Sequence, residues 1–522
     1  MIAVNDNQIN EQMMSNFFTS ELFKQVQMSG VFADSKTFVD ATPKLPLNDI
    51  LKKFDELQND GEHGGISSAK LLSFVKQYFM LPEQSEITFA SESKGIEQHI
   101  ATLWEVLTKP ADVPSNNSLL SLSKPYVVPG GRFREIYYWD SYFTALGLLV
   151  SGRQQTVVDM LDNFVSLQSR YGCIPNGNRS YYQTRSQPPI LGLLVELLLP
   201  FQQDRAAFIE HYIDSIEKEY AFWMDGHHKL NEEFTTYRRV VRMPDGNILN
   251  RYWDDSATPR PESYREDVEL FNETSPDNPE DFYRNIRAAC ESGWDFSSRW
   301  LGQDNTLASI RTTQIVPVDL NSLLYKIECL LSEYLLVLGS TERSGEFQKK
   351  AQQRQRAINR YLWSNEYGFF LDYDIEHHGH QPIPVLSLAG VVPLFVMLAN
   401  EEQALHVAEK LQQDFLKTGG LVTTLVTSHQ QWDSPNGWAP LHWFAVKGLI
   451  SYENTNLAVE IATRWNLTVE QFFEQSGKLM EKYNVCQLQS KARGGEYDVQ
   501  EGFGWTNGVY LGLSGLIQTR KC

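Results

Sequence analysis

Two distant segments of the chain combine aromatic, charged and glycine residues in a way that suits a sugar. Residues 129–140 read Pro-Gly-Gly-Arg-Phe-Arg-Glu-Ile-Tyr-Tyr-Trp-Asp, and residues 431–440 read Gln-Trp-Asp-Ser-Pro-Asn-Gly-Trp-Ala-Pro. A pyranose stacks its apolar C–H faces on indole or phenol rings, and its hydroxyl groups bind carboxylates and guanidinium groups. The two segments therefore predict carbohydrate binding, with two well-packed aromatic turns as the simpler alternative.

Acidic residues in similar surroundings raise the question of glycoside cleavage. Breaking a glycosidic bond needs one carboxylic acid to protonate the leaving oxygen and a second carboxylate that attacks carbon or activates water. The candidate acids are Asp140, Asp254, Asp255, Glu262, Asp295, Asp433, Glu481, Glu496 and Glu501. Since only two can react, most of these acids are expected to bind substrate or to cap helices.

Asp295 and Glu481 are the two acids with the clearest reason to react. Asp295 lies between Trp294 and Phe296, and desolvation by such neighbours raises the pKa of a carboxyl, as a general acid requires. Aspartate is also a strong N-cap, and the residues alone favour neither role. Glu481 ends a helical pattern over residues 456–481, where an acid opposes the helix dipole and needs another reason to be present.

Three further segments contain polar residues of functional interest. Residues 493–505 mix glycines with acids and aromatic residues, which predicts a lid over the sugar, while their glycine spacing does not match a nucleotide loop. The guanidinium groups of Arg132, Arg179, Arg185 and Arg260 can bind hydroxyls or hold carboxylates, with surface ion pairing equally plausible for Arg179. The histidines at 377, 378 and 380 lack the spacing of a metal site, which favours a solvated loop without metal.

The elements that must position these residues are mainly helices. Apolar residues recur at helical spacing with little alternation of period two, so we expect an all-α fold. Antiparallel helix pairs bury their apolar stripes on one another, and six pairs can close into a double ring with the chemical loops at one rim. The expected helices cover residues 140–151, 155–170, 189–199, 205–223, 319–338, 344–362, 386–399, 402–416, 439–452, 456–481 and 506–517.

Residues 1–95 differ from the remainder in their polar runs and isolated amphipathic turns. We expect them to form an extension that wraps the outside of a catalytic unit over residues 96–522, the two forming a single domain. No repeat of 20 to 50 residues and no long linker rich in proline, serine or glycine separates further units.

Composition narrows the partners of this 522-residue chain. Its 46 basic and 65 acidic residues give a net charge of −19, which disfavours nucleic acid and anionic membranes. The five cysteines have no zinc-like spacing, and the first residues lack the features of a secretory signal, so we expect ordinary thiols in a cytoplasmic protein. The most apolar stretch, residues 189–201, is too short to span a membrane. We further expect a monomer.

Taken together, these segments resemble the trehalase family of inverting glycoside hydrolases. Residues 129–142 and 431–440 match the two family signatures, and similar text continues through residues 174–179, 185–189, 242–253, 292–300 and 502–508. The resemblance covers residues from about 30 to the C-terminus. It implies an (α/α)6 barrel, a six-hairpin toroid with long active-site loops at one rim, that hydrolyses α,α-trehalose to two glucose molecules without a cofactor.

The resemblance also assigns roles to individual residues. Asp295 matches the general acid and Glu481 the general base that activates water. Single displacement would then give one α- and one β-glucose. The implied substrate contacts are Arg132, Phe133, Trp139, Asp140, Asn176, Arg185, Ser186, Gln187, Arg260, Pro261, Glu262, Gly293, Trp432, Trp438 and Glu496.

The chain departs from the family in its lid. Many relatives carry four or five consecutive glycines before Glu-Tyr, whereas this chain has Lys-Ala-Arg-Gly-Gly over residues 491–495. Fewer glycines allow fewer backbone states, so we expect a stiffer lid and slower product release. Two alternative functions remain: a six-hairpin glycosidase acting on maltose-like or larger α-glucans, and a catalytically silent sugar sensor. An open cleft would indicate the α-glucan glycosidase, and loss of the catalytic acid and base would indicate the sugar sensor.

Overall fold

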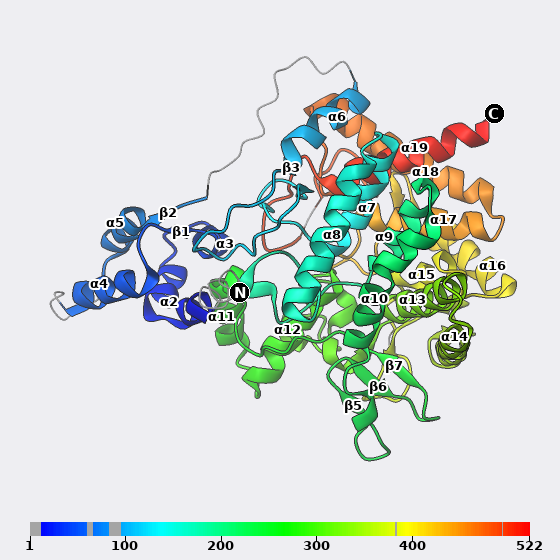
Figure 1. The fold of residues 1–522 in the computed structure, drawn as a ribbon, viewed down its shortest axis with the longest axis horizontal. Helices are drawn as coiled ribbons and strands as arrows, with labels where there is room; N and C mark the ends of the chain where they lie inside the picture. Colours follow the sequence, from blue (N-terminus) through cyan, green and yellow to red (C-terminus); the bar gives the residue numbers. More distant parts are fainter. Residues whose placement is uncertain (1–11, 60–65, 83–94, 382–383, 493, 522) are drawn as a thin grey trace.

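Helices make up most of the computed structural model, which describes residues 12–59, 66–82, 95–381, 384–492 and 494–521 (Figure 1). The expectation of a mostly helical protein is confirmed. From residue 96 onward the α-helices are α6 (Ile96–Leu107), α7 (Tyr138–Val150), α8 (Gln154–Tyr171), α9 (Leu191–Leu198), α10 (Arg205–Trp223), α11 (Tyr264–Thr274), α12 (Pro279–Ser292), α13 (Val318–Val337), α14 (Thr341–Tyr361), α15 (Val392–Phe395), α16 (Glu401–Lys410), α17 (Ala439–Ser451), α18 (Thr455–Ser476) and α19 (Gly504–Lys521).

Helices that follow one another along the chain pack together in pairs. Thus α13 packs on α14, α17 on α18 and α7 on α8, while α19 returns to pack along α7. The α7/α19 contact is close because glycines meet there: a Cβ on Gly508 would lie 2.0 Å from the carbonyl oxygen of Phe143, and one on Gly147 2.6 Å from the Cα of Gly508. The two ends of the helical array are therefore joined.

The N-terminal helices have an apolar cluster of their own. Ser20 and Ser67 cap α2 and α5 by accepting hydrogen bonds from backbone N–H groups in the first turn. Apolar residues from 14 to 79 pack together with Tyr137, Tyr181 and Tyr182 of the following part of the chain. In Figure 1 these helices lie to one side of the main helical array. They are α2 (Glu21–Met28), α3 (Lys36–Val39), α4 (Leu47–Asn59) and α5 (Ser68–Tyr78).

Short strands and single helical turns connect the α-helices. The antiparallel strand pairs are β1 (Thr42–Pro43) with β2 (Phe79–Met80), β3 (Thr108–Lys109) with β4 (Tyr126–Val127), β8 (Ile315–Val316) with β11 (Tyr373–Asp374), β9 (Trp363–Ser364) with β10 (Phe369–Phe370), β12 (Leu416–Lys417) with β13 (Gly420–Leu421), and β14 (Asn436–Trp438) with β15 (Lys482–Asn484). One sheet has three strands, β5 (Thr236–Tyr237), β6 (Val240–Arg242) and β7 (Ile248–Asn250).

The remaining short helices lie mainly in the loops. The 3-10 turns are η1 (Ser180–Tyr182), η2 (Leu199–Phe201), η3 (His227–Lys229), η4 (Pro261–Ser263), η5 (Ser298–Trp300), η6 (Leu307–Ser309), η7 (Thr312–Gln314) and η8 (Leu388–Val391), and η9 (Leu411–Phe415) is a π-helix that extends α16.

Three helix expectations differ from the structure. The helix expected over residues 456–481 ends at Ser476, because Gly477 adopts a left-handed conformation, so Glu481 is not a helix-terminal acid. The helix expected over residues 386–399 is the turn η8 followed by the short α15. Helices α6, α11 and α12 were not among the expected helices. For α12 the reason is that its buried face includes Asn285, Arg287 and Glu291, which weaken the apolar period.

Within the described ranges, no helix is both long and apolar enough to cross a membrane. Cys173, Cys290, Cys329 and Cys486 are free thiols, and Cys522 lies outside the described residues. The division of the chain at residue 95 stays a prediction.

Candidate active site

One cavity collects nearly all of the residues expected to bind a sugar. It is lined by the loop before α7, the first turn of α7, the α8–α9 loop, η4, the end of α12, β14, the residue before β15 and the loop before α19. The expected residues at its wall are Arg132, Phe133, Trp139, Asp140, Asn176, Arg185, Gln187, Arg260, Glu262, Gly293, Asp295, Trp432, Trp438, Glu481 and Glu496.

Ser186 and Pro261 are not among the lining residues. Ser186 is buried, and its hydroxyl donates to the carbonyl of Ile174 at 2.6 Å while its N–H donates to Glu291 at 2.9 Å. The carbonyl of Pro261 accepts a hydrogen bond from Gln27 of α2 at 3.2 Å. In this structure both residues support neighbouring segments of the site.

A buried aromatic stack forms one wall of the cavity. The indole rings of Trp432 and Trp438 lie parallel with their centres 3.8 Å apart, and Trp294 also stacks on Trp432, with ring centres 5.3 Å apart. Trp139 packs against Trp432 at a tilt, and Trp505 packs against Trp438 in a T-shaped arrangement. Such a wall offers apolar surface for the C–H face of a pyranose.

Gly293 shows why the end of α12 approaches this wall so closely. It ends α12 in the left-handed conformation, with φ of 75°. A Cβ at this position would lie 2.8 Å from the indole of Trp139. Both the left-handed backbone and the close approach of Trp139 require a glycine at position 293. Asp295 follows two residues after this glycine.

The carboxyl of Asp295 lies in surroundings that favour its protonated form. Burial raises its pKa to about 7, with the charge of Glu496 adding to the rise and Arg260 opposing it. The N-cap of the following turn η5 is Ser297, which accepts from the N–H of Arg299. The capping role considered for Asp295 therefore belongs to Ser297.

Glu481 is positioned by strand pairing. In the antiparallel pair β14 and β15, Trp438 lies opposite Lys482, and Glu481 is the residue before Lys482. Glu481 therefore lies next to the aromatic wall. Oε1 of Glu481 accepts a hydrogen bond from the phenol of Tyr497 at 2.7 Å. The other oxygen, Oε2, has no hydrogen-bond partner among the described residues and lies 3.7 Å from the amine of Lys482.

Asp140 is a third acid at the same cavity. It lies in the first turn of α7, and burial raises its pKa well above the ordinary value, with the charges of Glu481 and Asp295 adding to the rise. A neutral carboxyl at this place can donate a hydrogen bond to a sugar hydroxyl as well as accept one.

A buried network fixes Arg185 at the cavity wall. Its guanidinium group contacts Glu262 at 2.6 Å, Asp254 at 3.3 Å and the amide oxygen of Asn176 at 3.0 Å. Burial alone would raise the pKa of Glu262, but the neighbouring arginines hold this pKa below its ordinary value. Oε2 of Glu262 is buried and lacks a hydrogen-bond partner among the described residues.

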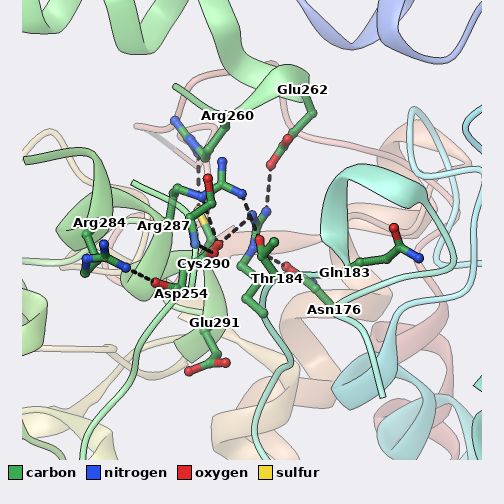
Figure 2. Close-up of polar contacts among 12 residues, drawn as sticks. Asn176, Gln183, Thr184, Asp254, Arg260, Glu262, Arg284, Arg287, Cys290 and Glu291 are labelled. Carbon is green, nitrogen blue, oxygen red and sulfur yellow. Dashed lines mark hydrogen bonds and ion pairs between the residues drawn. The ribbon is translucent and has the colours of Figure 1, made fainter. Parts of the chain in front are cut away.

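Asp254 belongs to the layer behind these residues. Figure 2 shows it between arginines of α12: Arg287 contacts its carboxylate at 2.9 Å, and Arg284 donates to its carbonyl at 2.6 Å. Arg287 also donates to the hydroxyl of Thr184 at 3.1 Å. Asp254 thus joins α12 to the α8–α9 loop and orients Arg185.

Arg260 connects the acid side of the cavity to the loop before α19. Its guanidinium group pairs with the buried Asp267 at 2.5 Å and with Glu496 at 2.8 Å, and it donates to the thiol of Cys290 at 3.3 Å. These contacts place the arginine beside Asp295, whose pKa it lowers. Arg260 therefore holds Glu496, which itself lines the cavity, at the sugar site.

The N-terminal helices also contribute to the site through buried ion pairs. Lys36 of α3, which lines the cavity, contacts Asp40 at 2.9 Å and Glu135 at 2.7 Å. Arg179 contacts Glu135 at 3.1 Å and Asp40 at 3.6 Å. Two cations and two carboxylates thus link α3 to the loop before α7, and Arg179 is a structural residue.

The other candidate acids hold loops together. Asp433 is fully buried and accepts hydrogen bonds from Ser297, Ser298, Thr424 and Ser428. Asp255 and Glu501 pair at the surface with Arg238 and Lys478 respectively. None of these three acids lines the cavity.

The histidine loop has an acidic cluster but also its own cation. Asp374, Glu376 and His377 place ligand atoms close together. Arg311 contacts Asp374 at 2.7 Å and Glu376 at 2.7 Å, so one cation of the protein already pairs with both carboxylates. The arrangement is that of an ion-paired loop.

Several lining residues were not identified from the sequence. Tyr497, Phe503 and Trp505 belong to the lid segment, so their aromatic character was a usable signal, whereas Lys36 lies almost 100 residues before the first motif and carried none. The others are Tyr137, Tyr182, Ser263, Glu266, Cys290 and Gln431.

Comparisons with known proteins show which family this chain resembles. A family model described as trehalase matches residues 30–517. Among solved structures, the neutral trehalase from Saccharomyces cerevisiae is similar with a TM-score of 0.60 and 29% sequence identity, over 75% of this chain and 73% of that chain.

More distant structures share the fold. A GH63 mannosylglycerate hydrolase from Thermus thermophilus in complex with Tris and D-glycerate has a TM-score of 0.53 and 18% identity, over 80% of this chain and 99% of that one. A structure of this mannosylglycerate hydrolase in complex with glucose has a TM-score of 0.53 and 17% identity, with the same coverage of both chains. At this identity the likeness concerns the fold alone.

Proposed function

Because this chain belongs to the trehalase family, we propose that it hydrolyses α,α-trehalose to two glucose molecules. The similarity to a neutral trehalase at 29% identity supports this substrate. The cavity supports it through an aromatic wall for the sugar faces and arginine and carboxylate groups for the hydroxyls.

We also propose that the helices form an (α/α)6 barrel with the active-site loops at one rim. The succession α7, α9, α13, α15, α17 and α19 supports an inner ring, because each helix contacts the next and α19 contacts α7. Helices α8, α10, α14 and α18 would then belong to the outer ring.

In the proposed mechanism Asp295 is the general acid and Glu481 the general base. Asp295 protonates the oxygen that bridges the two glucose units, and the bond from that oxygen to one anomeric carbon breaks. Glu481 removes a proton from a water molecule, whose oxygen attacks the same carbon from the opposite face. The attacked ring is released as β-glucose and the leaving ring as α-glucose.

The contrast between the two carboxyls is the observation that carries this proposal. Burial raises the pKa of Asp295 to about 7, so a large fraction of it holds a proton near neutral pH. Glu481 has one oxygen occupied by Tyr497 and the other without a partner among the described residues. One carboxyl is suited to donate a proton and the other to accept one.

Proton NMR of the purified protein with α,α-trehalose tests the proposal directly. The anomeric signals are recorded before mutarotation equalises them, with maltose and sucrose as parallel substrates. Equal early amounts of α- and β-glucose from trehalose alone are expected. Release of α-glucose only would indicate retention, and cleavage of maltose without trehalose would indicate an α-glucan glycosidase.

A further inference from the structure

The loop before α19 contacts both sides of the cavity at once. Glu496 pairs with Arg260 on the acid side at 2.8 Å. One residue later, Tyr497 donates to Glu481 on the base side at 2.7 Å. The side-chain oxygen of Gln500 accepts from the N–H of Arg132 at 2.7 Å. Three side chains of residues 496–500 therefore hold the segment against the sugar site.

The ring of Tyr497 is enclosed by cations and an aromatic residue. The guanidinium carbon of Arg132 lies 4.8 Å from its centre, and the amine of Lys482 lies 5.5 Å away. Phe133 contacts its edge at 5.4 Å. Both cations are attracted by the π-electrons of the ring, which helps to hold the phenol in place.

The phenol is a permanent hydrogen-bond donor. Burial raises the pKa of Tyr497 well above its ordinary value, and the neighbouring charges of Glu481 and Asp295 add to the rise. The hydroxyl consequently keeps its proton across the pH range in which glycosidases work. It donates this proton to Oε1 of Glu481.

Hydrogen bonds also hold the backbone of Glu481, whereas its carboxylate accepts a hydrogen bond only from Tyr497 among the described residues. The N–H of Glu481 donates to the carbonyl of Gln500 at 2.9 Å, and Trp505 donates to the carbonyl of Glu481 at 2.9 Å. Within the described residues, Oε1 is the one carboxylate oxygen of Glu481 that accepts a hydrogen bond, and the amine of Lys482 lies 3.7 Å from Oε2. The Tyr497 phenol therefore sets the plane of the carboxylate.

We propose that Tyr497 is a positioning residue for the general base. By occupying Oε1 of Glu481, the phenol leaves Oε2, which has no hydrogen-bond partner among the described residues, as the oxygen that accepts a proton from the attacking water. Because Tyr497 is packed under Arg132, the base is oriented only while the 496–500 segment is docked on the sugar site. This inference rests on the proposed function, since it assumes that Glu481 activates water.

The Tyr497→Phe variant tests this role because it removes the hydroxyl and keeps the ring under Arg132. We expect kcat for trehalose to fall roughly 10- to 100-fold, the range set by loss of one hydrogen bond to an ionised group, with KM changed less than about threefold. In a Glu481→Gln background the same change should have almost no further effect on kcat, because the group that it orients is gone.

Tyr510→Phe is the matched control. The phenol of Tyr510 in α19 donates to the carboxylate of Glu470 at 2.7 Å, and Tyr510 does not line the cavity. This variant loses the same kind of bond, so it should keep wild-type kcat while its thermal unfolding midpoint shifts as much as that of Tyr497→Phe. Unfolding midpoints of all variants are measured alongside the kinetics.

The outcomes separate this inference from the proposed function. A wild-type protein that leaves trehalose intact overturns both. A wild-type protein that cleaves trehalose, together with unchanged kcat in Tyr497→Phe, overturns the positioning role alone. The same conclusion follows if Tyr497→Phe lowers kcat equally in the presence and absence of the Glu481 carboxylate, because the two residues would then act independently.

Discussion

Asp295 and Glu481 line the same cavity, but different parts of the fold surround them. Asp295 follows a helix end, between Trp294 and Phe296, and burial dominates the rise of its pKa. Glu481 precedes a strand and receives a hydrogen bond from Tyr497, which belongs to another loop. The acid side thus depends on local sequence and burial, whereas the base side depends on a contact between segments. A carboxyl that must hold a proton needs exclusion of water, and one that must accept a proton needs orientation.

Removal of the acid should have the largest effect. Asp295→Asn keeps the shape of the side chain and removes its proton, so we expect kcat to fall about 10²- to 10⁴-fold, the usual contribution of a general acid. Trehalose affinity, followed by tryptophan fluorescence, should change little because the aromatic wall remains. Wild-type turnover in this variant would remove Asp295 from the mechanism.

Removal of the base should have the next largest effect and should separate Glu481 from Glu496. Glu481→Gln is expected to lower kcat about 10²- to 10³-fold with a small change in KM, whereas Glu496→Gln should act mainly on KM because it loses the contact with Arg260. The two variants are compared by steady-state kinetics on trehalose. If Glu496→Gln showed the larger loss of kcat, the base would have to be reassigned.

The decline of activity at high pH should report the acid side of the site. A general acid works below its pKa, so kcat/KM should decline as pH rises through about 7, the value to which burial raises the pKa of Asp295. Glu496 adds to this rise, so Glu496→Gln should move the declining limb to lower pH. Tyr510→Phe, which is remote from the cavity, should leave the limb unchanged. A limb that stayed in place in Glu496→Gln would mean that another group is the acid.

The smallest effect is expected from the lid backbone. Arg493 lies outside the described residues, so the test concerns its neighbour Ala492. Ala492→Gly adds backbone freedom worth roughly 0.5–1 kcal/mol, and turnover should rise by at most about fivefold if lid opening limits it. Ala111→Gly, in an exposed loop elsewhere, is the control. Equal turnover in both variants would show that lid opening is not limiting.

Part of the fold could be predicted because apolar periodicity is a local property. The helix expected over residues 319–338 is α13, since Leu320, Leu324, Ile327 and Leu331 follow its spacing and are buried. Helix α12 was not expected because arginine and glutamate occupy part of its buried face. Those charges become acceptable only beside partners such as Asp254 and Arg239, which come from other segments.

The sequence by itself determined the mostly helical character, the aromatic and acidic motifs and the family. These depend on residue types within short windows, where spacing and side-chain chemistry are visible directly. Only the tertiary structure decided that Lys36 lines the cavity, that Ser297 is the cap beside Asp295, and that Tyr497 contacts Glu481. Such relations depend on which distant segments meet, and burial and hydrogen bonding arise only once they do.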